Sequence, residues 1–314
     1  MAASSIYSLP LIALIVVVIV VAGVGGALVY LQQHPKPVTP RQTVQVGDNV
    51  TVNYIGTFGS GAESGRVFDT SIYSVYVDNV TYPKSLFFPY THGGSPSNYT
   101  PLGVHVGPNS PSYTIGSISF VSVVPGFWQG LLGLPVGETR TISVSPALGY
   151  GPADPSCFVT KNLTYTVPVY TALNLTAFQA AYPNVTASPG VEFPDPHYGW
   201  PVLVLSSNGV TVSVENLPTV GERSDPSGWP VVVSQISGTP NGSGKITLVN
   251  QLSQSQSGLV LGNLTSGSPP CSSSAGDRFI VSNVNPATGT YTEDFNSEVT
   301  AQTLLFTVTV VQFY

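Results

Sequence analysis

Residues 123–151 (VVPGFWQGLLGLPVGETRTISVSPALGYG) constrain the fold more than any other stretch of the chain. Gly126 permits a sharp entry into a helix and Pro135 forbids its continuation, so a helix over 127–134 has two turns at most. The residues of 139–145 alternate between apolar and polar, which predicts a half-buried strand. A Gly-Tyr-Gly loop then presents one aromatic ring between two flexible residues. The stretch therefore predicts a helix–strand unit that ends in an exposed tyrosine.

A second patterned stretch precedes it at 44–55. Val46, Val50, Val52 and Tyr54 alternate with polar residues, and a Gly-Asp turn lies within the run. This alternation predicts another strand. A Gly-rich loop follows, and after it comes the short run VFDTS.

Both stretches resemble the FKBP-type peptidyl-prolyl isomerases. In that family V-I-P-G-(W/F)-x-x-G-(L/M) leads into a strand and an A-Y-G loop, and G-D-x-V-x-V-x-Y-x-G with F-D-(S/T)-S lies upstream. The residues on the first motif are Pro125, Gly126, Phe127, Gly130, Leu131, Leu134, Gly137, Glu138, Arg140, Tyr150 and Gly151. The run YTIG at 113–116 is similar to a further strand of the family. The alternative is a helix–strand unit without this function.

The resemblance implies a mainly β (α+β) fold, in which an antiparallel half-barrel surrounds a short helix. The family's last strand is similar to 303–311, and the preceding Asp-Phe-Asn resembles the insert-in-flap branch of bacteria and archaea, although that match is partial. We expect these parts in order: an N-terminal tail at 1–8, a transmembrane signal anchor at 9–31, a Pro-rich linker at 32–43, an FKBP-like part at 44–150, a β-rich insert at 151–293 and a second FKBP-like part at 294–314.

The insert contains an internal repeat. The run GWPVLV at 199–204 recurs as GWPVVV at 228–233, and each copy leads through a turn into a second strand. A third hairpin is expected around 285–289, and a short helix within 172–181. The repeated tryptophan is either core or an exposed client-binding residue, and core packing is the favoured interpretation. The pattern of 72–112 indicates an elaborated loop, with a short hairpin at most. Its histidines, His92 and His105, do not have the spacing typical of metal ligands.

The N-terminal 33 residues carry no charged side chain, and 9–31 form an apolar run long enough to span a bilayer. A cleavable signal peptide is the alternative, but a basic n-region is missing. Lys36 and Arg41 favour a cytoplasmic body by the positive-inside rule. Glycosylation sequons favour the outside. They lie at Asn49, Asn79, Asn98, Asn162, Asn174, Asn184, Asn241 and Asn263. We expect a single-pass protein of the cell membrane with an extracytoplasmic body.

The chain carries a net charge of −6, so nucleic acid is not an expected partner. Only 8% of its residues are charged, which suits an extracellular surface. Cys157 and Cys271 are the only cysteines. Outside the cell they would form a disulfide, and two buried thiols are the alternative.

The resemblance also implies which residues act. The pocket residues and those that would assist catalysis are Tyr54, Phe68, Asp69, Val123, Val124, Phe127, Tyr150 and Phe306. Tyr113 and Trp128 would be further substrate-binding residues. Isomerisation of a prolyl bond requires no nucleophile, metal or cofactor, and we expect none. The scattered histidines suggest no metal site.

We expect a prolyl isomerase whose insert holds unfolded or proline-containing polypeptides, as a chaperone would. One alternative is a non-catalytic surface binding protein that keeps the fold. Another is a pilin-like subunit, although the basic residue that pilin processing normally needs is missing. The sequence leaves the oligomeric state and the identity of the clients open.

Overall fold

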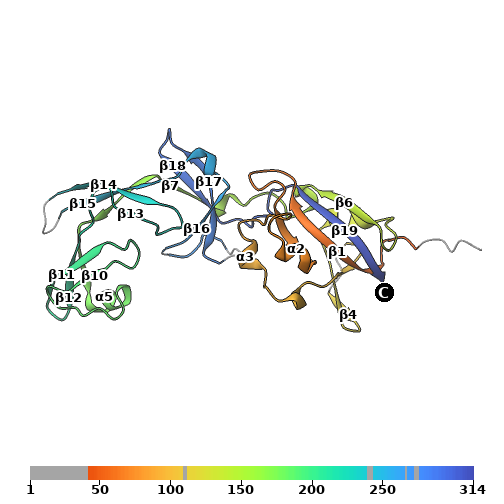
Figure 1. The fold of residues 1–314 in the computed structure, drawn as a ribbon, viewed down its shortest axis with the longest axis horizontal. Helices are drawn as coiled ribbons and strands as arrows, with labels where there is room; N and C mark the ends of the chain where they lie inside the picture. The colour runs from red at the N-terminus through yellow and green to blue at the C-terminus, as the bar shows by residue number, and fades with distance from the viewer. Residues whose placement is uncertain (1–41, 109–111, 239–242, 266, 272–275) are drawn as a thin grey trace, which may run out of the picture. The chain divides into compact units, whose positions relative to one another are not determined.

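The computed structural model describes residues 42–108, 112–238, 243–265, 267–271 and 276–314 (Figure 1). The expected membrane anchor at 9–31 and most of the linker at 32–43 lie outside these residues. In the described part of the chain, no helix has the length and hydropathy needed to cross a membrane. Val44–Tyr314 form one compact unit.

A seven-stranded sheet carries the parts of the chain that resemble an FKBP. Its order is β4-β5-β3-β1-β19-β6, and β2 pairs with β1 outside this path. Only β3 and β5 are parallel; every other pair is antiparallel. The strands are β1 (Asn49–Phe58), β2 (Val67–Thr70), β3 (Leu102–His105), β4 (Tyr113–Ile115), β5 (Ile118–Val121), β6 (Thr139–Val144) and β19 (Leu304–Phe313).

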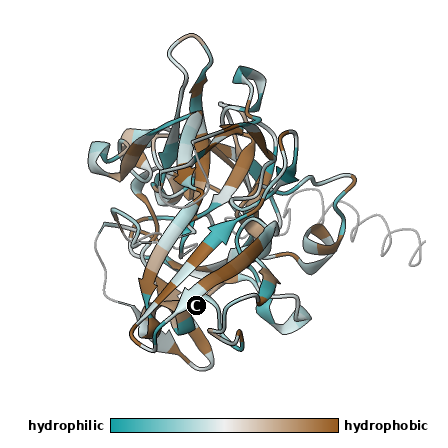
Figure 2. Ribbon diagram, turned by 90° about the vertical axis from the view of Figure 1, so that its left-hand side faces the viewer, coloured by the Kyte–Doolittle hydropathy of each residue, from teal (hydrophilic) through white to brown (hydrophobic). Residues whose placement is uncertain are grey.

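Helix α4 (Pro125–Leu131) packs against β6, as the sequence predicts. Its buried residues Phe127 and Leu131 join the apolar side chains of β1, β6 and β19 in one core. Gly130 sits where the helix approaches the sheet, because a Cβ there would collide with the side chain of Ile142. In Figure 2 the strands carry most of the apolar residues.

The segment 72–112 differs from the expected loop. It contains α2 (Tyr73–Val77), α3 (Phe88–Thr91), a 3₁₀ turn η1 (Pro96–Asn98) and β3. Strand β3 pairs with β1, whereas β4 pairs only with β5. The YTIG run that resembles a family strand therefore lies in an edge hairpin, and LGVH takes the place beside the central strand. The sequence alone did not show which run pairs with β1, because apolar residues alternate with other residues in both runs.

The insert consists of three four-stranded antiparallel sheets, ordered β10-β11-β12-β9, β13-β14-β15-β8 and β16-β17-β18-β7. The first three strands of the insert, which follow one another in the chain, each belong to a different sheet. The remaining strands then complete the three sheets in the reverse order. The strands are β7 (Phe158–Asn162), β8 (Thr164–Pro168), β9 (Tyr170–Asn174), β10 (Glu192–Pro194), β11 (Pro201–Ser207), β12 (Thr211–Asn216), β13 (Arg223–Ser224), β14 (Val231–Ser237), β15 (Lys245–Asn250), β16 (Val260–Asn263), β17 (Arg278–Asn285) and β18 (Thr290–Asp294).

The internal repeat of the sequence corresponds to the central hairpins of these sheets. The third expected hairpin is β17–β18, and the expected helix is α5 (Leu175–Ala181), which is capped by the Asn174 side chain. Each hairpin has a register shift, typical of a β-bulge, in its first strand. The sheets share one apolar core. The sequence therefore detected two of three structurally equivalent units by identity and the third by its turn.

Both repeated tryptophans are core residues, as the favoured interpretation holds. Trp200 and Trp229 are 1% and 2% exposed. Each indole Nε1 donates to the side-chain oxygen of an asparagine near the end of the partner strand, Asn216 at 3.0 Å and Asn250 at 2.7 Å. Asn216 in turn donates to the carbonyl oxygen of Pro168, the last residue of β8, and Asn250 donates to that of Leu163, between β7 and β8. Through these asparagines, each tryptophan is linked to the segment that contains the first three strands of the insert.

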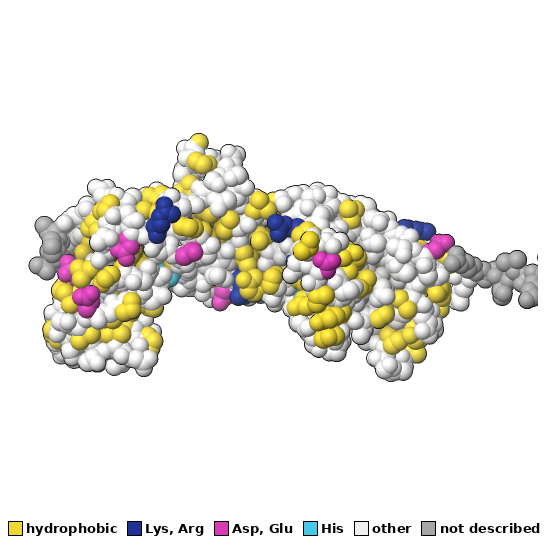
Figure 3. Space-filling model, in the orientation of Figure 1, with side chains coloured by type: hydrophobic (Ala, Val, Ile, Leu, Met, Phe, Trp, Pro, Cys, Tyr) yellow, Lys and Arg dark blue, Asp and Glu magenta, His cyan; other side chains and the backbone are white. Residues whose placement is uncertain are grey.

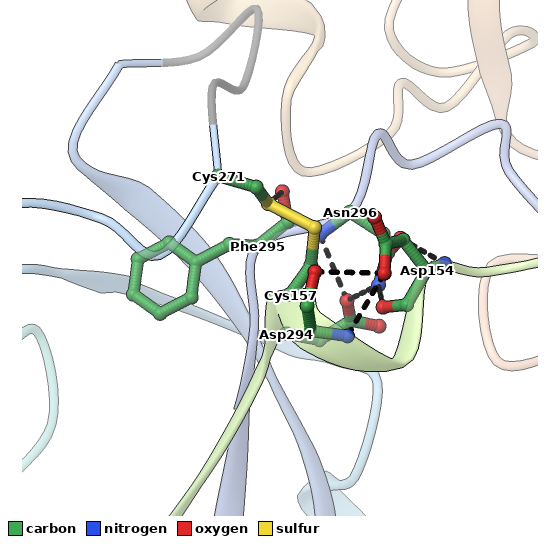
Figure 4. The surroundings of a disulfide bond; sticks show 7 residues. Asp154, Cys157, Cys271, Asp294, Phe295 and Asn296 are labelled. Carbon is green, nitrogen blue, oxygen red and sulfur yellow. Dashed lines mark hydrogen bonds between the residues drawn. A yellow bond between two sulfur atoms is a disulfide. The ribbon is translucent and has the colours of Figure 1, made fainter.

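A disulfide joins Cys157 to Cys271 (Figure 4). Cys157 ends the 3₁₀ turn η3 (Pro155–Cys157), through which the chain enters the insert. Beside it, the Asp154 N–H donates to Asn296 Oδ1 at 2.8 Å, and Asn296 Nδ2 donates to the Asp154 carbonyl at 3.3 Å. The entering and returning segments are therefore fastened together at the base of the insert.

Candidate active site

Four aromatic side chains from four elements meet in the core of the seven-stranded sheet. Phe306 of β19 is central, with ring centroids 4.9 Å from Phe127 and 5.5 Å from Phe68, both in edge-to-face contact. Tyr54 of β1 lies 6.1 Å from Phe127 and 6.3 Å from Phe306. The three phenylalanines are 3–5% exposed, so their rings are shielded from bulk water. Residues that are 252 positions apart in the chain thus form one apolar cluster.

Asp69 places a carboxylate at the edge of this cluster. Tyr54 Oη donates to Asp69 Oδ2 at 2.6 Å. Burial raises the pKa of Tyr54, and the negative charge of Asp69 raises it further. The phenol therefore stays protonated at neutral pH and continues to donate, while the Asp69 side chain remains 40% exposed.

Tyr150 stands on the short loop after β6 and is 50% exposed. Burial raises the pKa of its phenol, and the charge of Asp69 adds to the shift. The neighbouring Tyr150 phenol also contributes to the raised pKa of Tyr54, so these three groups share one electrostatic environment. A protonated phenol with half of its surface exposed is able to donate a hydrogen bond to a bound peptide.

The remaining expected site residues fall into two places. Val123, Val124 and Trp128 are partly buried and pack against the core that holds the aromatic cluster. Tyr113 lies elsewhere: its hydroxyl contacts His105 and Asn49, and its ring stacks on Phe120. The structure thus places Tyr113 beside β3 and not in contact with the four rings.

His92 is a site residue that the sequence did not indicate. Its Nε2 lies 3.0 Å from Asp69 Oδ1, and its ring stacks on Phe88 with centroids 4.0 Å apart. An ionised carboxylate only accepts, so Nε2 carries the proton in this contact. His92 follows α3 within the segment 72–112, and its spacing from other polar residues in the sequence gives no signal. The contact depends on the fold of that segment.

A cavity of about 870 Å³ adjoins the cluster and includes Tyr54 and Asp69 in its lining. His92, Tyr99 and residues of β5 also line it. Phe68, Phe127 and Phe306 are not part of this lining, and Phe127 and Phe306 adjoin the cavity through their contacts with Tyr54. Within the described residues, no three His, Cys, Asp or Glu side chains gather in a way that could hold a metal ion.

This arrangement suits a substrate that is uncharged and partly apolar. Rings shielded from water favour an apolar group such as a pyrrolidine, and the polar edge supplies one carboxylate and two phenols. A peptide carbonyl could accept from Tyr150, and an N–H could donate to Asp69. No group in the cluster is placed as a nucleophile with an adjacent base.

Comparison with known proteins agrees with this geometry. Residues 112–170 match the family model described as FKBP-type peptidyl-prolyl cis-trans isomerase. The chain is 30% identical over 112 residues to the short-type peptidyl-prolyl cis-trans isomerase of Methanocaldococcus jannaschii, which covers 35% of this chain and 53% of that protein. It is 29% identical over 119 residues to FK506-binding protein 2 of Yarrowia lipolytica, which covers 37% of this chain and 55% of that protein.

The chain spans about half the length of the curated relatives that it matches. The match runs from β4 to the start of β9, and it includes Phe127 of α4 and Tyr150 of the loop after β6. Residues 112–170 of this chain therefore correspond to an FKBP-type peptidyl-prolyl cis-trans isomerase domain.

Proposed function

We propose that this chain catalyses the cis–trans isomerisation of X–Pro peptide bonds at the aromatic cluster. The observation that carries the proposal is the meeting of Tyr54, Phe68, Phe127 and Phe306 beside Asp69 and Tyr150. The substrates would be proline-containing polypeptides.

The barrier to this rotation is about 18–20 kcal/mol and arises from amide resonance. At the twisted midpoint the carbonyl has lost part of its dipole, so it is less costly to remove from water than the planar amide. A site shielded from water therefore favours the twisted form. Tyr150, kept protonated, would donate to a substrate carbonyl and hold the chain in place while the bond turns. Asp69 would accept from an N–H at the pocket edge.

We further propose that the protein is anchored in the membrane with its body outside the cytoplasm, and that it belongs to the insert-in-flap branch. The apolar run at 9–31 supports the anchor. The Cys157–Cys271 disulfide supports an oxidising compartment. Few charged side chains lie on the face drawn in Figure 3, which suits an extracellular surface. Protease treatment of intact cells, followed by detection of the body, tests this localisation: protection of the body would contradict it.

In this proposal the insert holds unfolded clients near the active site. It starts directly after the loop of Tyr150 and returns directly before β19, so it is tied to two elements of the site. Its surface includes exposed apolar side chains, among them Val210 and Val220 at 71% and 64% exposure. A variant without the insert should turn over short peptides but lose its effect on the aggregation of an unfolded protein.

A protease-coupled assay with a short proline peptide tests the catalytic proposal. Phe127→Ala and Tyr150→Ala should each lower kcat/KM by ten-fold or more, whereas Phe158→Ala, an exposed phenylalanine of the insert, should not change it. Asp69→Ala should have a smaller effect than Phe127→Ala. A wild-type rate at background level would end the catalytic proposal, and macrolide binding without turnover would favour the non-catalytic alternative.

A further inference from the structure

The cavity beside Asp69 is larger than one proline residue requires. Its volume of about 870 Å³ lies near the top of the range of roughly 300–1,000 Å³ that is usual for ligand pockets. Tyr54 and Asp69 link it to the aromatic cluster. Beyond them its lining is drawn from the segment 98–103, from 117–121 and from the last strand.

One wall is formed by Tyr99, whose position is fixed on several sides. Its ring lies 4.7 Å from that of Tyr76 and 5.7 Å from that of Tyr73. Its hydroxyl donates to the carbonyl oxygen of Gly93 at 2.9 Å. Burial raises the pKa of Tyr99 to about 12. Tyr99 therefore presents a rigid, uncharged aromatic surface, which loses little conformational entropy when a ligand binds.

The β4–β5 hairpin forms the facing wall. Ile118 and Val121 are partly exposed and contribute apolar surface, while Ser117 and Ser119 are exposed hydroxyl-bearing residues. The hairpin lies so close to β3 that a Cβ on Gly103 would collide with the carbonyl oxygen of Ser119. This glycine lets β5 pair with β3 and so fixes the distance across the cavity.

The chemistry of the lining is that of a peptide-binding surface. The lining combines hydroxyl and amide groups with apolar side chains and His92, and its described side chains include no Lys or Arg and one carboxylate, Asp69. Such a lining suits an extended chain, whose N–H and C=O groups need uncharged partners and whose side chains need apolar contacts. A phosphate or nucleic acid would instead require cations.

We propose that this cavity is an extended subsite for the client chain, and that it binds the residues next to the proline while the proline lies against Tyr54 at the edge of the aromatic cluster. The proposal rests on the proposed isomerase function and adds a substrate class: polypeptides with several residues in extended conformation beside the X–Pro bond. The segment 72–112 and the β4–β5 hairpin would then determine which prolines the enzyme prefers.

The test compares two peptides with the same central X–Pro bond, one of four residues and one of twelve uncharged residues. Isomerisation of both is followed by NMR exchange with wild type and with Ser119→Trp, which places a large ring in the cavity without removing a contact. Val80→Trp is the matched control, because Val80 lies in the segment 72–112 at 94% exposure and outside the lining. A second variant, Tyr99→Leu, removes the aromatic wall.

The long peptide should have a KM at least five-fold below that of the short one with wild type and with Val80→Trp. Ser119→Trp and Tyr99→Leu should abolish this difference by raising the KM of the long peptide to that of the short one. Equal KM values in wild type, or a difference that survives Ser119→Trp, would overturn the subsite while leaving the isomerase function intact. Failure of wild type to turn over either peptide would overturn the isomerase function, and the subsite with it.

Discussion

His92 Nε2 lies 3.0 Å from Oδ1 of Asp69, and Tyr54 Oη lies 2.6 Å from Oδ2 of the same carboxylate. The two oxygens of Asp69 are therefore held by two different parts of the chain, the central strand and the segment that follows α3. A carboxylate with both oxygens engaged has one orientation at the pocket edge, so the elaborated segment contributes directly to the geometry of the site.

Removing the His92 contact should leave the Asp69 carboxylate held by Tyr54 alone, and therefore less firmly oriented. A hydrogen bond to a charged group contributes about 1.5–3 kcal/mol. Because Asp69 is partly exposed, solvent screening reduces the contribution of this one. His92→Ala should lower kcat/KM on a short proline peptide by about 3–10-fold, and His92→Gln, which retains an N–H of similar reach, should recover most of it. His105→Ala is the control, since His105 contacts Asn49 and Tyr113 and not Asp69. Equal losses in the Ala and Gln variants of His92 would contradict a positioning role.

Gly130 should be intolerant of a side chain although it lies in a helix. Alanine is favoured over glycine within a helix by about 1 kcal/mol. At this position its Cβ would collide with Ile142, and overpacking a core costs about 1–3 kcal/mol. Gly130→Ala should therefore lower the free energy of unfolding, measured by urea denaturation, by up to about 2 kcal/mol. Gln129→Ala, one residue earlier and exposed, should change it by less than about 0.5 kcal/mol.

The disulfide should stabilise the insert by restricting the unfolded chain. Cys157 and Cys271 are 114 residues apart, and chain-entropy arguments give about 4–5 kcal/mol for a loop of this length, with measured losses of about 2–5 kcal/mol. The double variant Cys157→Ser/Cys271→Ser should unfold at lower urea concentration than wild type. Addition of a reductant should shift wild type to the same midpoint and leave the double variant unchanged. If the reductant also shifted the midpoint of the double variant, the loss of stability would not be due to this disulfide.

Stability should fall as the pH rises through neutrality because of Glu298. Burial raises the pKa of its carboxyl from 4.5 to about 7; the nearby Glu63 adds to the shift, and the hydrogen bond from Ser85 opposes it. The folded state therefore holds a proton that the unfolded state releases between about pH 4.5 and 7. This contribution is fully present below pH 4.5 and is lost as the pH passes 7.

The size of this effect is on the order of 2–3 kcal/mol. Glu298→Gln, which keeps the shape of a protonated carboxyl, should flatten the pH dependence and raise the free energy of unfolding at pH 8. Urea denaturation at pH 5, 6.5 and 8 measures both. Burial also raises the pKa of Glu63, so a smaller slope of the same sign should remain. An unchanged slope in Glu298→Gln would contradict this account.

Several features of the fold follow from local patterns. The breakers Gly126 and Pro135 limited α4 to a short helix, and alternation located β1 and β6. The similarity of 303–311 to the family's last strand located β19. The GWPV repeat revealed two hairpins of the insert, and the apolar character of Trp200 and Trp229 favoured burial, which the structure shows. These are short-range signals, because they depend on residues within a few positions of one another.

The motif spacing also placed Tyr54, Phe68, Phe127 and Phe306 in one site. In contrast, Tyr113 was assigned to the pocket wall through a strand-like run, and the structure puts that run in an edge hairpin. The run LGVH pairs with β1 instead. Two short alternating runs compete for one place beside a strand, and only the packing of the whole sheet selects between them.

The sequence by itself determined the elements, the aromatic residues and the resemblance to a family, since each depends on residue type and on fixed spacing along the chain. The tertiary structure decided the contacts between remote segments: His92 with Asp69, Tyr99 with the rings of α2, and the pairing of three entering strands with three later hairpins. These contacts join residues that are far apart in the sequence, so no local sequence pattern predicts them. They form because burial of the shared cores holds the segments in place.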